Sequence, residues 1–357
     1  MKKIYRVAFV GAGGMAHAHA YALDALPHYY EDIPFVSRIA VASKTRESRS
    51  TFAARYGFAE ALETDDLWKR GDIDAVFLLS PNEFHYPHLK KALFELCAER
   101  IYVEKPICVS QSEASELSEL KIPASRFMQI GFQFLQMSAI RRALRWWRED
   151  GGGSPIHFHC RYLHSGYLDP SYREKRRWRL VPAPSGGALV DLGSHGFSLL
   201  VAFLGKNLEV ISARRSGQFD DVPVQSDLCA TVLLKDNTSG AMGTLVASRV
   251  SAGTGDLLEL EIFGTQGALR FSTDRPDGLE IFLTGQGHWE SISCGSDYPP
   301  VTGFPSPKVP GGWLRSLVHA HYIFLGGRDL DAFHPDLDHA LAVQRFIHGA
   351  VEKMEKG

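Results

Sequence analysis

Near the start of the chain, residues 7–16 read Val7-Ala8-Phe9-Val10-Gly11-Ala12-Gly13-Gly14-Met15-Ala16. This is an apolar strand followed by the pattern G-x-G-x-x-G/A, which opens a helix in dinucleotide-binding folds. Gly11 permits a tight turn, Gly13 lets the backbone approach a diphosphate, and Ala16 lets the helix pack on the strand. The helix N-terminus then favours an anion. We therefore expect a bound dinucleotide at Gly11, Gly13, Gly14, Met15 and Ala16.

Outward from this turn, strand-like and helix-like segments alternate up to residue 131. The expected strands are 6–11, 37–42, 75–79, 101–103 and 127–132, and the expected helices are 15–26, 48–56, 88–100 and 113–120. Such alternation predicts a parallel, doubly wound Rossmann sheet and an α/β class. We assign residues 1–131 to a dinucleotide-binding domain.

The remainder of the chain has a different pattern. Its expected helices are 138–148 and 336–353, and its expected strands are 156–162, 208–216, 226–234, 239–248, 257–263, 268–272 and 279–283. Consecutive strands joined by turns predict a large, mostly antiparallel open sheet. Residues 132–357 are therefore expected to form an α+β domain that carries most of the substrate site. Residues 285–311, rich in Gly, Ser and Pro, are predicted to form a long surface loop near that site.

The bulk composition excludes several classes of protein. A formal net charge of -2 provides no field for nucleic acid or anionic lipid, and no apolar run approaches the length of a membrane span. Five cysteines without a C-x-x-C pair indicate a reducing, cytoplasmic compartment and no zinc site. Two histidine groups, His17 with His19 and His157 with His159 and His164, lack a matching ligand cluster, so no metal is expected.

Basic side chains follow the second predicted strand. Glycine-turn proteins that bind NAD usually place a carboxylate there, whereas this chain has Ser43, Lys44 and Arg46. A serine hydroxyl and two cations suit a 2′-phosphate, which favours NADP over NAD. A solvated basic turn is the alternative reading.

Two further motifs carry chemistry. Glu104-Lys105-Pro106 closes a strand at the edge where open parallel sheets bind ligands, so the lysine is within reach of a substrate. Asp191 and His195 are four residues apart on an expected helix and so share one face. There, the histidine is suited to exchange a hydroxyl proton and the carboxylate to orient its ring.

These motifs occur together with Ser80-Pro81-Asn82, His85 and Phe263-Gly264-Thr265-Gln266-Gly267. In this combination and order, the chain resembles the Gfo/Idh/MocA oxidoreductases, named for glucose–fructose oxidoreductase and inositol dehydrogenase. The resemblance covers nearly the whole chain. It implies that Lys105, Asp191 and His195 form a catalytic triad, with His195 as the acid/base and Lys105 on the substrate oxygen.

The resemblance also implies other partners and contacts. It places Ser80, Pro81, Asn82, His85, Glu104 and Lys105 at the cofactor, and Trp178 and Arg179 with the triad at the substrate. It implies a homodimer or homotetramer formed through the C-terminal sheet. Two departures from the family pattern, Ser198 in place of an aspartate and Gln133-Phe134-Leu135 in place of Asn-Arg-Arg, predict a substrate site unlike that of inositol dehydrogenase.

The leading hypothesis is an NAD(P)-dependent dehydrogenase or reductase acting on a sugar, cyclitol or related polyol. A second hypothesis is a glycoside-cleaving enzyme that uses tightly bound NAD transiently. A third is a non-catalytic regulator that senses dinucleotide on the same fold. The presence of Lys105, Asp191 and His195 together argues against the third.

Overall fold

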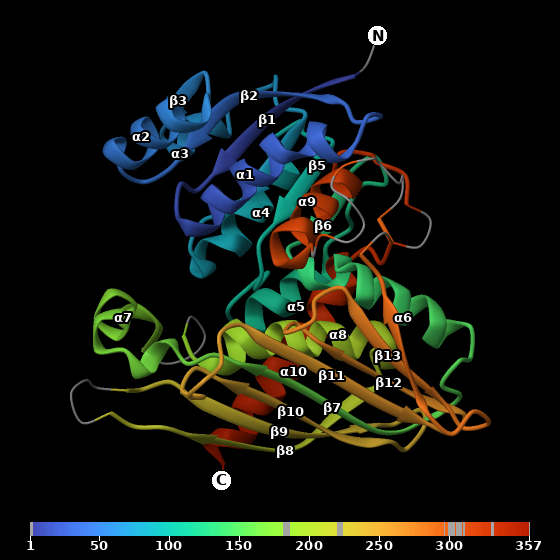
Figure 1. Cartoon of the computed structure of the whole chain (residues 1–357). Coiled ribbons are helices and arrows are strands. Elements are labelled where there is room, and N and C mark those ends of the chain that lie inside the picture. Colours follow the sequence, from blue (N-terminus) through green and yellow to red (C-terminus); the bar gives the residue numbers. More distant parts are fainter. Residues whose placement is uncertain are drawn as a thin grey trace.

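The computed structural model describes residues 3–180, 186–219, 224–295, 297–298, 304, 309, 311–329 and 332–356. Within these residues, the N-terminal part forms a six-stranded sheet and the C-terminal part an eight-stranded sheet, with helices between them (Figure 1). This arrangement confirms the α/β class, with a Rossmann half and a second half built on a large open sheet.

Every neighbouring pair in the N-terminal sheet is parallel. In sheet order its strands are β3 (Glu60–Leu62), β2 (Phe35–Ala42), β1 (Ile4–Val10), β4 (Ala75–Leu78), β5 (Arg100–Val103) and β6 (Phe127–Ile130). Its helices are α1 (Gly14–Tyr29), α2 (Arg46–Tyr56), α3 (Thr64–Leu67), α4 (His85–Phe94) and α5 (Gln111–Glu119). The strand order reverses between β1 and β4, and ligands bind at the carboxyl ends of strands at such a point.

Sequence periodicity placed one helix too far along the chain. The helix expected at 88–100 is α4, which ends at Phe94, because the chain must turn back to enter β5. The guanidinium of Arg126 donates to the main-chain carbonyls of Leu96 and Ala98 in this turn, so these groups are satisfied without a helix. The short elements β3 and α3 were not expected.

The C-terminal sheet is antiparallel except for the pairing of β7 with β10. In sheet order its strands are β14 (Trp289–Ser293), β13 (Gly278–Leu283), β12 (Gly267–Ser272), β11 (Leu257–Gly264), β7 (Pro155–Leu163), β10 (Met242–Ser248), β9 (Cys229–Asp236) and β8 (Leu208–Ser216). The associated helices are α6 (Ser138–Arg148), α7 (Pro170–Lys175), α8 (Ser194–Leu204), α9 (Gly312–Phe324) and α10 (Leu337–Glu355).

Alternate residues of the C-terminal strands point into a core shared with helices α8 and α10. On β9, Ala230, Val232 and Leu234 are fully buried, and they belong to one apolar cluster with Leu199 of α8 and Val343 of α10. Period-two burial of this kind is the pattern of a sheet with one covered face. Association of chains through the C-terminal sheet stays a prediction.

Helix α9 joins the N-terminal half although it lies late in the sequence. Leu317 and Tyr322 of α9 are fully buried in the cluster that contains Phe9 of β1 and Ala20 of α1. Neither α9 nor β14 was expected, and β14 falls inside the predicted loop 285–311, part of which lies outside the described residues. The division of the chain into domains at residue 131 stays a prediction, since α9 follows residue 131 in the sequence but packs in the N-terminal half.

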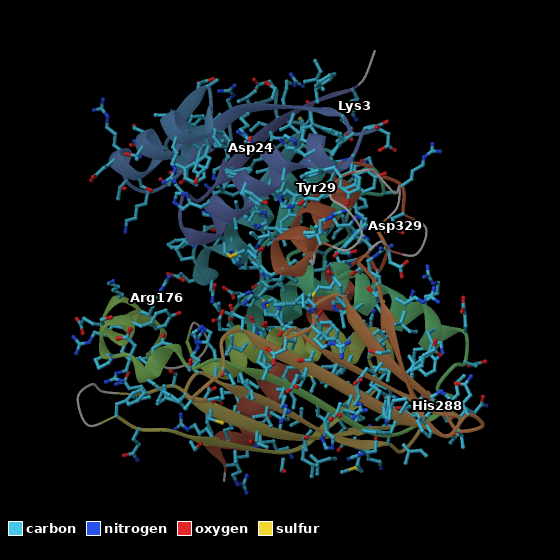
Figure 2. The ribbon with its side chains drawn as sticks, viewed as in Figure 1. Lys3, Asp24, Tyr29, Arg176, His288 and Asp329 are labelled. Carbon is cyan, nitrogen blue, oxygen red and sulfur yellow. The ribbon has the colours of Figure 1, made fainter. Side chains whose placement is uncertain are left out.

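A buried ionic cluster ties α6 to α9. Figure 2 labels Asp329, whose carboxylate accepts from Arg141 of α6 and lies 2.8 Å from His319 Nε2. The Tyr30 hydroxyl, at the end of α1, lies 2.6 Å from His319 Nδ1 and accepts from Arg315 at 2.7 Å. Burial holds the pKa of His319 at about 3, so its ring stays neutral in this cluster. These contacts place α9 rigidly between the two halves.

Candidate active site

A cavity of about 540 Å³ lies at the carboxyl ends of the N-terminal strands. Residues of both halves line it, among them Ser80, Asn82, Glu104 and Lys105 from one half and Tyr162, Asp191, His195 and Arg249 from the other. The cavity therefore lies where the strand order predicts a ligand site.

The glycine turn has the geometry of a dinucleotide cradle. Gly11 has a φ of +114°, and a Cβ there would lie 2.4 Å from the carbonyl oxygen of Leu79. At Gly13 and Gly14, by contrast, a Cβ would meet no atom within 4 Å, so the backbone is open to a ligand. Helix α1 begins here without a side-chain cap and without an acidic residue in its first turn. Its N–H groups are therefore suited to a diphosphate.

The basic turn after β2 lies at the surface. Lys44 and Arg46 are exposed, and Ser43 is partly buried. Sequence reasoning missed Arg49, which holds this turn by donating to the carbonyls of Ser43 at 3.1 Å and Lys44 at 3.4 Å. The three predicted side chains thus project from a fixed backbone.

The loop after β4 is held by His85. Its Nδ1 lies 2.7 Å from the carbonyl oxygen of Pro106, and its Nε2 lies 2.7 Å from that of Ser80. Both ring nitrogens therefore connect the loop after β4 to the loop after β5. Ser80 and Asn82 line the cavity at this place, and His85 supports their position from within the protein.

Glu104 is buried at the base of the cavity. Its Oε1 lies 3.0 Å from His19 Nε2, and His19 Nδ1 lies 3.0 Å from His321 Nε2. Burial, and secondarily the neighbouring His19, hold the pKa of His321 well below its usual value, so that ring is neutral. Its Nδ1 donates to the Leu317 carbonyl at 2.8 Å, which leaves Nε2 as an acceptor for His19. His19 Nδ1 therefore donates to His321, and the His19 ring connects His321 to Glu104.

Asp191 is the centre of the charged groups in the cavity. Lys105 Nζ donates to Asp191 Oδ1 at 2.9 Å and to the Asp191 carbonyl oxygen at 2.7 Å. Arg249 Nη2 donates to the other carboxylate oxygen, Oδ2. A carboxylate between two cations is strongly favoured in its ionised form. Sequence reasoning missed Arg249, which directly follows β10.

The segment that carries Asp191 is a π-helical turn, Leu189–Gly193, that leads into α8. Two residues before this turn, at Gly187, φ is +94° and a Cβ would lie 2.1 Å from Asp227 Oδ1. Asp227 Oδ2 accepts from the Leu189 N–H at 2.7 Å, and burial raises the pKa of this carboxyl. Gly187 thus makes room for the Asp227 side chain, which holds the turn.

His195 lies in an aromatic wall of the same cavity. Its ring centroid is 4.9 Å from that of Phe134 and 5.9 Å from that of Tyr162. Burial, and then the Lys105 charge, hold the pKa of His195 well below its ordinary value, so the ring is neutral. No hydrogen bond joins His195 to Asp191 in the described part of the chain. The expected orientation of the ring by Asp191 is therefore not seen, because the π turn directs Asp191 to Lys105 and Arg249.

The structure also places the residues that depart from the family pattern. Ser198 is buried behind the cavity, with its hydroxyl 2.8 Å from His339 Nε2. In the orientation that satisfies both groups, the Gln133 amide donates to the Gly131 carbonyl at 2.8 Å and accepts from Trp313 Nε1 at 2.6 Å. Trp313 belongs to α9, lines the cavity and was not expected. The side chains of Trp178 and Arg179 lie outside the described residues.

Two kinds of feature are absent from the described residues. No group of three or more His, Cys, Asp and Glu side chains among them is arranged to hold a metal ion. Among the same residues, no helix has the length and apolar character that crossing a membrane requires.

Comparisons with known proteins agree with this architecture. Residues 5–132 match a family model described as an oxidoreductase family with an NAD-binding Rossmann fold, and residues 140–270 match the GFO/IDH/MocA C-terminal domain. Levoglucosan dehydrogenase of Pseudarthrobacter phenanthrenivorans is 24% identical over 350 residues, covering 89% of this chain and 88% of that protein. The scyllo-inositol 2-dehydrogenase (NAD(+)) of Bacillus subtilis is 25% identical over 287 residues, covering 79% of this chain and 78% of that protein.

Solved structures share the fold over the full length. The crystal structure of an NAD-binding oxidoreductase from Klebsiella pneumoniae superposes with a TM-score of 0.87 at 24% identity, covering 100% of this chain and 98% of that chain. At this identity the likeness establishes the fold alone.

Proposed function

Because the chain belongs to the GFO/IDH/MocA family of NAD-binding oxidoreductases, we propose that it transfers a hydride to or from a nicotinamide dinucleotide. The other partner in this transfer is a carbon that carries a hydroxyl or carbonyl group, in a sugar, cyclitol or related polyol. The observation that carries this proposal is a convergence. Lys105, at the end of β5, and His195, on α8, line one cavity, whose floor includes the strand ends next to the glycine turn.

The chain's own residues would manage the proton. His195 is neutral and buried, so it is suited to accept the proton of a substrate hydroxyl during oxidation. Lys105, held by Asp191, would donate to the same oxygen and stabilise the negative charge that develops on it. The nicotinamide, when bound, supplies the hydride chemistry. A neutral His195 beside a cation fits a reaction that begins with loss of a hydroxyl proton.

The cavity walls favour a polyhydroxylated ligand. Both aromatic and polar side chains line it, among them Phe134, Tyr162, His164, Tyr172, Thr273 and Trp313. Aromatic faces suit the C–H faces of a sugar ring, while a few placed polar groups fix its orientation. The names of two relatives, levoglucosan dehydrogenase and scyllo-inositol 2-dehydrogenase, agree with that class of substrate.

A panel of sugars, cyclitols and polyols, each assayed for nicotinamide absorbance with NAD and NADP, tests the proposed function. We expect at least one substrate to produce continuing net turnover. Glycoside cleavage without net change in the nicotinamide, by protein that retains its cofactor, would favour the glycoside-cleaving alternative. Cofactor binding with no turnover of any substrate in either direction would favour a regulator and contradict the proposal.

We further propose that the chain prefers NADP to NAD. The support is the exposed pair Lys44 and Arg46 beside Ser43, at the strand end where a carboxylate would otherwise read the ribose. The Bacillus subtilis relative is named for NAD(+), so this preference depends on the chain's own residues.

Replacing both Lys44 and Arg46 with alanine should raise KM for NADP by about 10- to 100-fold and leave KM for NAD nearly unchanged, because charge-assisted bonds to the 2′-phosphate are lost. The matched control is Arg55→Ala, which removes an exposed cation from the last turn of the same helix α2. Steady-state kinetics with both cofactors provide the measurement. An unchanged KM for NADP would contradict the preference.

A further inference from the structure

Resting on the proposed function, we propose that Arg249 is a positioning residue, which holds Asp191 so that Asp191 in turn fixes the Lys105 ammonium beside the reacting oxygen. Asp191 presents three oxygens in two directions. Its carbonyl oxygen and Oδ1 accept from Lys105 at 2.7 and 2.9 Å, and its Oδ2 accepts from Arg249. Rotation of the carboxylate would break both contacts together, so the guanidinium determines where the ammonium lies.

Arg249 is more deeply buried than the groups it orients. Its side chain is 4% exposed, whereas the side chains of Lys105 and Asp191 are 12% and 25% exposed. Its main-chain N–H donates to Leu228 at 2.9 Å, and its carbonyl accepts from Tyr167 at 3.1 Å. The guanidinium also lies over the buried Tyr167 ring, 5.1 Å from its centroid. A group fixed at backbone and head in this way is suited to orient a more exposed carboxylate.

The main chain of Asp191 also contributes to this arrangement. At the π turn, its carbonyl oxygen accepts from Lys105 at 2.7 Å and from the Ser194 hydroxyl at 3.2 Å. The side chain and main chain of Asp191 therefore serve one ammonium together. Strand β10, which ends just before Arg249, packs against this turn and fixes the separation of the two cations.

Arg249 also changes the charge that a substrate meets. The two cations on one carboxylate place positive charge near the oxygen that loses its proton, while the hydride leaves from the carbon that carries this oxygen. The other titratable or charged groups that line the cavity are His85 and Glu104 from the N-terminal half and Tyr162, His164, Tyr172, His195 and Asp256 from the C-terminal half. Loss of the guanidinium would remove a positive charge that lies close to the Lys105 ammonium, so the ammonium would hold its proton to higher pH.

The test combines kinetics with a reading of Lys105 that needs no turnover. Arg249→Gln, which keeps a donor without the charge, should lower kcat by about 10- to 100-fold, the effect typical of lost supporting contacts, with KM changed little. The extent to which an amine-directed reagent labels Lys105 can be measured by mass spectrometry across a pH series. The pH at which labelling is half-maximal, called here the Lys105 midpoint, should be higher in Arg249→Gln than in the wild type. Arg249→Lys should restore the wild-type midpoint and part of kcat.

Controls separate this role from others. Arg161→Met, which removes a half-exposed guanidinium from β7 that pairs with Glu259, should change neither kcat nor the Lys105 midpoint. A raised KM with unchanged kcat in Arg249→Gln would show that Arg249 binds substrate directly and would overturn the proposal. An unmoved midpoint in folded Arg249→Gln, or in Arg249→Met if the former does not fold, would likewise overturn it.

The labelling experiment also distinguishes the two proposals. If no sugar or polyol is turned over but the Lys105 midpoint still moves in Arg249→Gln and returns in Arg249→Lys, the proposed function fails and the positioning role stands. If turnover is found and the Lys105 midpoint does not change in Arg249→Gln, the proposed function stands and the positioning role fails.

Discussion

Replacing Lys105 with methionine is expected to lower kcat by about 100- to 10,000-fold, because the substrate oxygen loses the cation that stabilises its negative charge as the proton departs. Methionine fills a similar volume without a charge, so the cavity shape should be kept. We expect the dinucleotide to contact mainly the glycine turn and the basic turn after β2, so its Kd should stay within about threefold of the wild-type value. Steady-state kinetics and a fluorescence titration with reduced cofactor measure the two quantities.

The matched control is Lys121→Met, which removes an exposed lysine from the same half of the protein. This control should retain wild-type kcat and Kd. Near-normal turnover by Lys105→Met would refute the assignment of Lys105 to the reaction. A loss of cofactor binding equal to the loss of turnover would instead assign Lys105 to the cofactor alone.

Replacing His195 with asparagine is expected to lower kcat for oxidation by about 100-fold or more, since the variant has no base at this position. The pH dependence follows from the direction of the shift. Burial first, and the Lys105 charge second, lower the pKa of His195 well below its usual value, so the neutral base is already present at pH 7. In the wild type, kcat/KM for oxidation should therefore lose its His195-dependent part only as the pH falls well below 6.5.

In His195→Asn, this acid-side loss should disappear together with most of the activity. His339→Asn is a matched control, because His339 is also buried, packs against Phe132 and has a pKa that burial lowers to about 4, yet it does not line the cavity. If kcat/KM of His195→Asn falls at low pH as it does in the wild type, another group carries the proton.

Much of the fold can be predicted from local sequence patterns. The glycine turn and the alternation of strands and helices are patterns of neighbouring residues, since Gly11 needs a positive φ wherever it stands and a strand needs only apolar residues in succession. For the same reason, α6 and β8 have the bounds that the pattern predicts. Helix α9 was not predicted although Leu317 and Tyr322 are suitably apolar. It follows a region rich in Gly and Pro, and no capping side chain marks its start.

By itself, the sequence determined the parallel and antiparallel sheets, the glycine turn and the family to which the chain belongs. Only the tertiary structure decided which side chains meet: Asp191 with Lys105 and Arg249 in the cavity, and His19 with Glu104 and His321 in the interior. These contacts join positions separated by 58 to 302 residues. Periodicity reports on residues within a turn or a strand of each other, whereas the partner of a buried charge is set by how whole elements pack.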